Sequence, residues 1–395
     1  MTRLTLNNAC TLVMIAAAAF TGTKAEAQCP AIELTTGLNF PLGIVQTNDG
    51  NFVVSESGRR GFRNSGRLSM VDLSGNRVTL IDGLPSGTND VGDPSGPAGV
   101  FMRGRTLYVA IGSGDSVLAG PLPRTQVVNP NPSSPIFSSV LAIHFSAHTG
   151  RITSGFPLTA GDQAALAAGE TVRLSNGGGD TIAIELVTNF PDYVLNPPPN
   201  PTSTVRVASN PFDLVAIADR LYVTDGGRNS VWQVDVPSGA SSTLVEFPTV
   251  PNPAFPAIGG PVVEAVPTGI STHAGQLLVT LFRGFPFPAG SSNVEQIDPA
   301  TGSRTVFIGG LKTAIDILAV RSETVEASHD YLVLQHASSP VLFATPGTLT
   351  RIDRGTGAAT VVAGCLNRPT SMARDARTGA VYITELLTGR LVVVY

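Results

Sequence analysis

The chain has 395 residues, of which 42% are hydrophobic and 14% are charged, with 42 glycines and 30 prolines. So much apolar chain can bury a large core, which excludes general disorder. The formal net charge is −4 and the only lysines are Lys24 and Lys312, so there is no basic run to bind nucleic acid or an anionic membrane surface.

Residues 1–27 have the pattern of a cleaved signal peptide. Arg3 precedes a short apolar run from Thr11 to Phe20, and Ala25-Glu26-Ala27 provides a cleavage site of the A-x-A type. The apolar run is too short to span a bilayer, and no second apolar stretch follows. We therefore expect a secreted or periplasmic protein without a membrane span, whose mature chain, 28–395, is a single domain and a monomer.

The mature sequence repeats a unit of four short strands. Each unit opens with a small-residue anchor, followed by a second apolar strand and, in most units, an Asp–Gly turn between the third and fourth strands. Repeats of this kind at a spacing of about 50 residues are typical of propeller blades, so the sequence predicts an all-β, six-bladed β-propeller. The anchors begin at Pro41, Pro97, Pro211, Pro267, Ala314 and Pro369.

The interval from Pro97 to Pro211 is about twice as long as the others. Either a seventh blade lies there or the second blade carries a long insertion. The region lacks a second anchor and contains Pro-rich stretches, which favours an insertion at about 113–205. An Ala-rich segment from Asp162 to Ala168 predicts a short helix within it.

The last unit lacks a fourth strand after Leu391–Tyr395, and the segment Ala31–Thr36 can supply it. We therefore expect the N-terminal strand to close the ring and leave no open edge.

The same alignment bears on Cys29 and Cys365. It offsets them by about eight residues, or about 26 Å along a strand, whereas a disulfide needs Cα atoms within roughly 7 Å. The expectation is no intrachain disulfide.

Several segments resemble the ScyD/ScyE family of secreted, NHL-like propellers. The most specific is Gly284–Gly290 (Gly-Phe-Pro-Phe-Pro-Ala-Gly), followed by Ile315-Asp316; the other matches are Gly96–Val100, Ser209–Phe212, Leu221–Gly227 and Val266–Ile270. The resemblance covers the chain from about Leu38 to Tyr395. It implies export and an NHL-like propeller fold, and it implies no established reaction.

Polar residues end four of the six second strands: Glu56, Asp225, Gln335 and Glu385. Carboxylates at one repeat position can ring a channel mouth and hold a hard cation such as calcium. The alternative, which we favour, is that each one caps a following turn.

Asp213 and Asp316 take the place of the anchor glycine in two units. A buried acid is costly without a partner, so these residues are either site residues or acceptors from the backbone of a neighbouring blade. His336 follows a second strand in the same unit as Asp316, where a carboxylate could orient it as a base. A packing or capping histidine is the simpler interpretation.

A metal-dependent lactonase of the gluconolactonase type is the obvious enzyme on such a fold. That family places Asn or Asp ligands after the anchor proline, whereas the corresponding residues here are Leu42, Ala98, Phe212, Thr268, Ile315 and Thr370. No G-x-S-x-G, H-E-x-x-H, C-x-x-C, P-loop or EF-hand pattern occurs either. These absences argue against the commonest hydrolase and metal chemistries.

The loops at 247–266 and around Phe285 and Phe287 are rich in proline and apolar groups, which suits a binding surface that loses little entropy on binding. The structural alternative is that the two phenylalanines cover a blade edge. Two functions stay open. The first is a binding or scaffold module for a protein, a glycan or a hydrophobic small molecule. The second is a metal-assisted hydrolase, lactonase or lyase at the central channel.

Overall fold

The structure is a computed structural model that describes residues 29–122, 125–200, 202–322, 329–339 and 345–395. The signal peptide predicted at 1–27 lies outside these residues. No helix in the described ranges is long and apolar enough to cross a membrane. The regular secondary structure of the described chain is almost entirely strand, as the sequence predicts.

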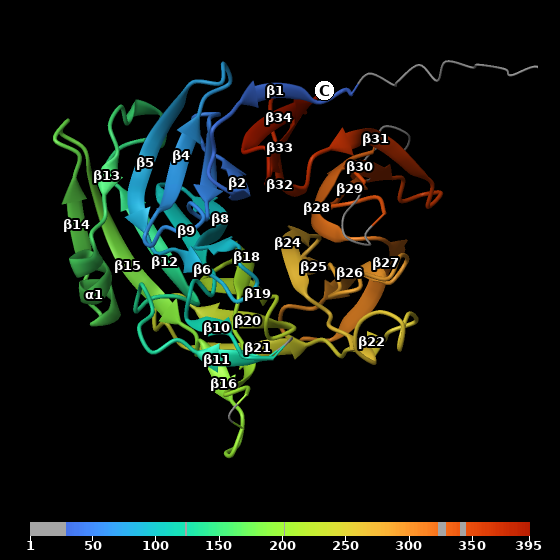
Figure 1. Ribbon diagram of the computed structural model, residues 1–395. Coiled ribbons are helices and arrows are strands. Elements are labelled where there is room, and N and C mark those ends of the chain that lie inside the picture. Colours follow the sequence, from blue (N-terminus) through green and yellow to red (C-terminus); the bar gives the residue numbers. More distant parts are fainter. Residues whose placement is uncertain (1–28, 123–124, 201, 323–328, 340–344) are drawn as a thin grey trace, which may run out of the picture.

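Within the described residues, six main sheets of four or five strands follow one another along the chain, and each is named here after its inner strand (Figure 1). The inner strands are β2 (Pro41–Gln46), β8 (Pro97–Arg103), β18 (Pro211–Ile217), β24 (Pro267–His273), β28 (Ala314–Arg321) and β32 (Pro369–Arg374). Each pairs antiparallel with a second strand: β3 (Phe52–Glu56), β9 (Thr106–Ile111), β19 (Arg220–Asp225), β25 (Gln276–Leu281), β29 (His329–Gln335) and β33 (Val381–Glu385).

The outer half of each sheet contains a third and a fourth strand. The third strands are β4 (Gly66–Val71), β12 (Ser139–Phe145), β20 (Ser230–Asp235), β26 (Ser292–Ile297), β30 (Gly347–Ile352) and β34 (Arg390–Val394). The fourth strands are β5 (Arg77–Leu84), β15 (Thr181–Asn189), β21 (Ser241–Glu246), β27 (Arg304–Leu311), β31 (Ala359–Leu366) and β1 (Ile32–Thr35). β1 pairs with β34, so the N-terminal strand completes the last sheet, as the alignment of the two ends predicts.

The inner strands lie toward the middle of the molecule and pack against one another in chain order, and β32 also packs against β2 (Figure 1). A cluster of buried apolar side chains fills the space between each two sheets that follow one another, including the space between the β32 and β2 sheets. Because strands alternate their side chains, the inner and second strands contribute apolar groups to both faces.

The long interval between Pro97 and Pro211 contributes strands to the β8 sheet and additional elements to its loops. β10 (Val117–Ala119), β11 (Gln126–Val128), β16 (Tyr193–Leu195) and β17 (Val205–Ala208) form a sheet of their own. β14 (Val172–Ser175) extends the β8 sheet, and β13 (Phe156–Pro157) pairs parallel with β5. The remaining short pairs are β6 (Gly87–Thr88) with β7 (Pro94–Ser95) and β22 (Val250–Pro251) with β23 (Val262–Val263).

The predicted helix is confirmed as α1 (Ala160–Ala167). It begins two residues earlier than predicted because Thr159 and Asp162 form a capping box that fixes its N-terminus. A 3₁₀ turn at Thr149–Arg151 precedes it.

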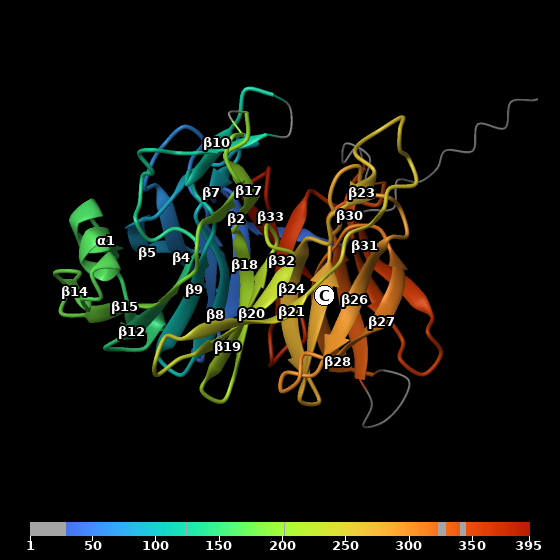
Figure 2. The same ribbon diagram turned by 90° about the horizontal axis from the view of Figure 1, so that it is seen from below.

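Loops that follow the second strands, and the crossovers from each fourth strand to the next inner strand, gather at one end of the molecule, called here the entry face. Figure 2 shows β10, β17 and β23 together at this end. All six inner strands have an irregular register at their anchor, just inside the entry face. Such bulges turn the backbone of the anchor toward the neighbouring sheet.

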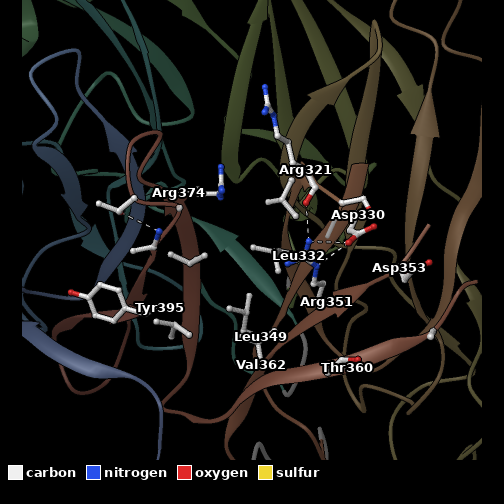
Figure 3. A pocket seen from close by; sticks show the side chains of 18 of the residues that line it. Arg321, Asp330, Leu332, Leu349, Arg351, Asp353, Thr360, Val362, Arg374 and Tyr395 are labelled. Atoms are coloured by element: carbon white, nitrogen blue, oxygen red, sulfur yellow. Dashed lines mark hydrogen bonds and ion pairs between the residues drawn. The ribbon is translucent and has the colours of Figure 1, made fainter. Parts of the chain in front are cut away.

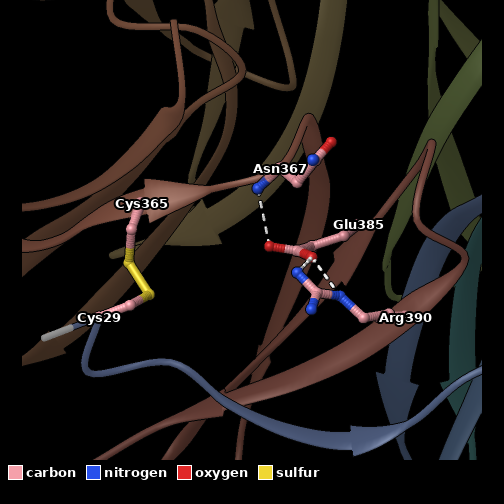
Figure 4. The surroundings of a disulfide bond; sticks show 5 residues. All are labelled: Cys29, Cys365, Asn367, Glu385 and Arg390. Carbon is pink, nitrogen blue, oxygen red and sulfur yellow. Dashed lines mark hydrogen bonds and ion pairs between the residues drawn. A yellow bond between two sulfur atoms is a disulfide. The ribbon is translucent and has the colours of Figure 1, made fainter.

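Cys29 and Cys365 form a disulfide bond, with their Cα atoms 5.7 Å apart (Figure 4). The prediction of no bond is therefore wrong. The prediction measured the distance between the two cysteines along a single strand, although β1 and β31 are the outer strands of two neighbouring sheets. The chain before β1 runs across to the end of β31. Because sheets twist, the start of one outer strand approaches the end of the next, and counting residues along a strand does not measure that distance.

Candidate functional site

The anchors of the inner strands line a narrow central channel. The third residue of each anchor faces this channel, and it is glycine in three sheets, aspartate in two and serine in one. The walls come so close together that no water-sized space remains between them. The lining residues are Leu42, Gly43, Gly99, Phe212, Asp213, Gly269, Ile315, Asp316, Thr370 and Ser371.

Asp213 bridges the β18 and β24 sheets. Its Oδ1 accepts a hydrogen bond of 2.9 Å from the N–H of Leu214, and its Oδ2 accepts one of 3.0 Å from the N–H of Ile270 on the next inner strand. Burial raises the pKa of Asp213 well above its ordinary value, and the charge of Asp316 raises it further. The residue as a whole is half-buried, but its carboxylate lies inside the channel.

Asp316 makes the same bridge from the β28 sheet to the β32 sheet. Its Oδ2 accepts hydrogen bonds from the N–H of Met372 (2.8 Å) and from the hydroxyl of Ser371 (3.1 Å), while the N–H of Ile317 donates to Oδ1 (2.7 Å). Burial raises the pKa of Asp316 to about 7, although these donors act to lower it. The carboxylates of Asp213 and Asp316 are thus two buried acids of one channel, and an oxygen of each already accepts a hydrogen bond from a backbone N–H of the following sheet.

Glu56, at the end of β3, is fully buried and binds the crossover that leads into β2. Its Oε2 accepts from the N–H of Asn39 at 2.6 Å and from Arg67 at 2.6 Å, and its Oε1 accepts from Ser69. The carboxylate therefore fixes the start of the inner strand to the second and third strands of the same sheet.

The other strand-end residues repeat this arrangement. Asp225 accepts from the N–H of Asn210 at 2.7 Å, and Glu385 accepts from the N–H of Asn367 at 2.7 Å (Figure 4). Gln335 does the same through its amide oxygen, with a hydrogen bond of 2.9 Å from the N–H of Lys312. Arg390 also binds Glu385 at 2.6 Å.

Each of these four side chains thus accepts a hydrogen bond from the backbone of the crossover that leads into the inner strand of its own sheet. Across the described ranges, no group of three or more His, Cys, Asp or Glu side chains is placed to hold a metal ion.

His336 is buried at the boundary between the β28 and β32 sheets. Its Nδ1 lies 2.9 Å from the carbonyl oxygen of Pro369, and its ring meets Phe282 edge-on at 5.6 Å between centroids. Burial lowers the pKa of His336 to about 4, so the ring is neutral at physiological pH and its Nδ1–H donates to that carbonyl. The sequence suggested that Asp316 could orient this ring, but the hydrogen bonds described above join Asp316 to Ser371 and Met372 on β32 and to Ile317 on its own strand.

Above the channel, on the entry face, is a small cavity of about 150 Å³. Leu42 and Phe212 separate it from the channel, and polar residues on its wall include Asn89, Asp93 and Asn210. Asn210 is held in place through its Oδ1, which accepts from the N–H of Ser113 at 3.1 Å. Sequence reasoning missed these polar residues because they lie in crossovers outside the repeated strand positions.

The two phenylalanines of the Gly-Phe-Pro-Phe-Pro run differ in position. Phe285 is 45% exposed, whereas Phe287 packs against the core between the β28 and β32 sheets. Their rings meet edge-on at 5.9 Å, and Phe287 contacts Phe282 in the same way at 5.8 Å. Arg283 is buried and holds this loop through a bond of 2.9 Å to the carbonyl of Ser291. Phe287 therefore anchors the loop and Phe285 faces solvent.

A second apolar loop, between β22 and β23, lies beside this one. Phe255 is 51% exposed and Ile258 is 42% exposed, while buried Asn252 holds the loop by donating to the carbonyls of Ile258 and Gly260, both at 2.7 Å. A Cβ at Gly259 would lie only 3.1 Å from Pro286, so the two loops are in contact. Their composition, rich in proline and apolar residues, was the signal for them in the sequence.

The sequence matches no protein-family model and no curated protein. Among solved structures, it is similar to a candidate oxidoreductase (glucose dehydrogenase) of Thermus thermophilus, with 14% identity over 92% of this chain and 98% of that one, at a TM-score of 0.49. It is also similar to the PQQ-bound aldose sugar dehydrogenase of Streptomyces coelicolor (14% identity, 92% and 96% of the two chains, TM-score 0.48). A third similar structure is an auxiliary nutrient-binding protein of Bacteroides thetaiotaomicron (8% identity, 90% and 69% of the two chains, TM-score 0.48). Identities and scores this low assign no chemistry to the present chain.

Proposed function

We propose that this chain is an exported binding module: a six-bladed β-propeller, closed by its N-terminal strand, that docks a protein partner on its entry face. Packing between successive inner strands, including β32 with β2, and the pairing of β1 with β34 support the closed ring. The Cys29–Cys365 disulfide supports export, because such bonds persist in oxidising compartments. The ScyD/ScyE resemblance, which implies a secreted propeller, belongs to the same proposal.

The observation that carries the binding function is the distribution of exposed apolar side chains. Of the 15 large hydrophobic residues exposed in the described ranges, 10 lie on loops of the entry face. Exposed apolar groups that gather on one face mark an interaction surface, whereas scattered ones do not. The ten residues are Phe62, Val91, Leu118, Leu122, Leu195, Phe255, Ile258, Val262, Phe285 and Leu387.

A protein partner suits this face better than a small ligand. The cavity above the channel measures about 150 Å³, whereas small-molecule sites usually measure about 300–1,000 Å³. Aromatic residues such as Phe255 and Phe285, held on ordered loops, are the usual anchors of protein interfaces. The engagement of Asp213, Asp316 and the strand-end acids by backbone N–H groups favours binding over a metal-assisted hydrolase or lyase.

Affinity capture with matched variants tests the proposal. Immobilised mature protein is exposed to extracellular and periplasmic extract, and bound proteins are compared for wild type, Phe255→Ser/Phe285→Ser and the control Val306→Ser/Val361→Ser. The control changes two exposed residues, 62% and 59% accessible, on outer strands away from the entry face. A partner that is retained by wild type and the control but released by the phenylalanine variant supports the proposal. Equal retention by all three proteins, or by none, contradicts it.

A further inference from the structure

A second, larger pocket lies between the β28 and β32 sheets, at the end of the molecule opposite the entry face. Its volume is about 760 Å³, within the range typical of small-molecule sites. It is lined by the ends of the inner strands β28 and β32, where Arg321 and Arg374 are the last residues, and by strands of both sheets (Figure 3).

The floor of this pocket is apolar. Leu332 and Leu349 come from the β28 sheet, and Val381 and Val394 come from the β32 sheet. All four belong to the hydrophobic cluster between the two sheets, and Val362 packs at its edge. The pocket is therefore a place where the core between two sheets opens to solvent, and an apolar group placed there would be removed from water.

The rim carries positive charge. Figure 3 shows the side chains of Arg321 and Arg374 at the same end of the pocket, beyond Leu349 and Val362. Arg321 and Arg374 are both exposed, and the described residues supply neither guanidinium with an ion-pair partner.

A third arginine, Arg351, is engaged within the protein: it binds Asp330 at 2.9 Å and donates to the carbonyl of Arg321 at 2.8 Å. Asp353 also lines the pocket, and it accepts from the N–H of Thr356 in its own turn at 2.8 Å. Among the side chains that line the pocket, three are cationic and two are anionic. Because Arg351 and Asp330 neutralise each other, Arg321 and Arg374 stand against Asp353, which leaves one positive charge in excess.

We propose that this pocket binds an amphipathic anion: an alkyl chain or aromatic ring on the floor, with one carboxylate, sulfonate or phosphate held between Arg321 and Arg374. Guanidinium groups present paired N–H donors that suit such oxyanions, and a site open to solvent leaves the head group partly hydrated. This site is separate from the entry face, so it does not depend on the proposed partner.

Calorimetry with decanoate tests the site, and three related compounds serve as comparisons. Acetate has the carboxylate without the alkyl chain, 1-decanol has the alkyl chain without the charge, and decyltrimethylammonium has the alkyl chain with the opposite charge. We expect saturable one-site binding of decanoate, and much weaker binding of the other three. Arg321→Gln/Arg374→Gln should weaken decanoate binding about tenfold, since it removes two partly exposed charge contacts. Arg173→Gln, which changes an exposed arginine on β14, should bind as wild type does.

A second pair of variants tests the floor. Val362→Phe fills the pocket and should abolish binding, whereas Val361→Phe, on the opposite face of β31 and 59% exposed, should not. Absence of saturable binding to decanoate overturns the proposal, as does equal affinity for decanoate and 1-decanol. Unchanged affinity in both Arg321→Gln/Arg374→Gln and Val362→Phe also overturns it, because binding then takes place elsewhere.

Discussion

Asp213 lies directly against Gly99 of the preceding inner strand: a Cβ built on Gly99 would come within 2.4 Å of the Asp213 Cα and 2.5 Å of its Oδ1. Gly269 and Asp316 repeat the relationship, with 2.7 Å from that Cβ to the Asp316 Cα. Each channel aspartate therefore follows a sheet whose anchor residue is glycine. The alternation of glycine and aspartate along the repeat is a packing pattern in which the missing side chain of one sheet makes room for the carboxylate of the next.

Gly99→Ala should destabilise the protein by about 2–3 kcal/mol, because the added methyl group meets backbone that cannot move without shifting the next inner strand. Urea denaturation monitored by fluorescence measures the loss. Gly309→Ala is the matched control: a Cβ there meets only Val306 at 3.8 Å, so its effect should stay within about 0.5 kcal/mol. Equal stability of the two variants would show that the channel wall yields easily.

The repeated anchors located every main sheet in the sequence, because they recur at one position in each inner strand. Side-chain direction at the strand ends was harder to predict. Glu56, Asp225 and Glu385 share a repeat position that suits either a ring of ligands or a set of caps, and only the structure shows each one bound to its own crossover. The pocket between the β28 and β32 sheets was also missed, since Leu349 and Val381 look like ordinary core residues in the sequence.

The channel aspartates should make stability depend on pH. Asp316 has a folded pKa of about 7 against an ordinary value of 3.8, so the folded state binds more protons than the unfolded chain between these values. Stability from this group is therefore full below pH 3.8 and is lost as the pH rises through about 7. The pKa of Asp213 is raised as well and contributes with the same sign.

The free energy of unfolding of the wild-type protein, measured in urea, should thus fall between about pH 6.5 and pH 7.5, by up to about 1.4 kcal/mol per pH unit for each titrating group, and should change less for Asp213→Asn/Asp316→Asn. This range avoids the titration of His336, whose pKa is lowered from 6.5 to about 4. Between these two values His336 makes stability increase with pH, which is opposite to the effect of the aspartates. The two proteins are compared by the slope of their unfolding free energy against pH, because asparagine also alters the hydrogen bonds and so changes the absolute stability. Parallel slopes would contradict the assignment of the pH dependence to Asp213 and Asp316.

Glu56→Gln should cost about 2–4 kcal/mol of stability. The substitution leaves the hydrogen bonds from Asn39, Arg67 and Ser69 without a charged acceptor. Removing one partner of a buried ion pair also leaves the other charge, here that of Arg67, without its counter-charge. Asp93→Asn is a fitting comparison, since Asp93 pairs with Arg60 at 2.7 Å on the surface, with side chains 53% and 60% exposed. That exposed pair should contribute less than about 1 kcal/mol. Thermal melts of both variants at one pH show which substitution lowers stability more. A larger loss of stability for Asp93→Asn than for Glu56→Gln would refute this prediction.

Removal of the disulfide should destabilise the N-terminal strand first. β1 is four residues long, its Ile32 is 56% exposed, and its pairing with β34 shifts register between Glu33 and Thr35, so few contacts hold it in place. The Cys29–Cys365 bond lies just before β1 and ties it to β31 of the neighbouring sheet. Cys29→Ser/Cys365→Ser should therefore lose about 2–5 kcal/mol and gain hydrogen exchange in β1 and β34 before other strands.

Two measurements separate this prediction from a general loss of stability. Mass spectrometry of the non-reduced protein should give a peptide pair linked through Cys29 and Cys365. Hydrogen exchange at matched fractions of unfolding should then show early exchange confined to β1 and β34 in the serine variant. Glu56→Gln, which weakens the neighbouring β2 sheet instead, provides the reference pattern. Exchange that rises equally in all sheets would mean that β1 stays paired with β34 without the disulfide, through the backbone hydrogen bonds alone.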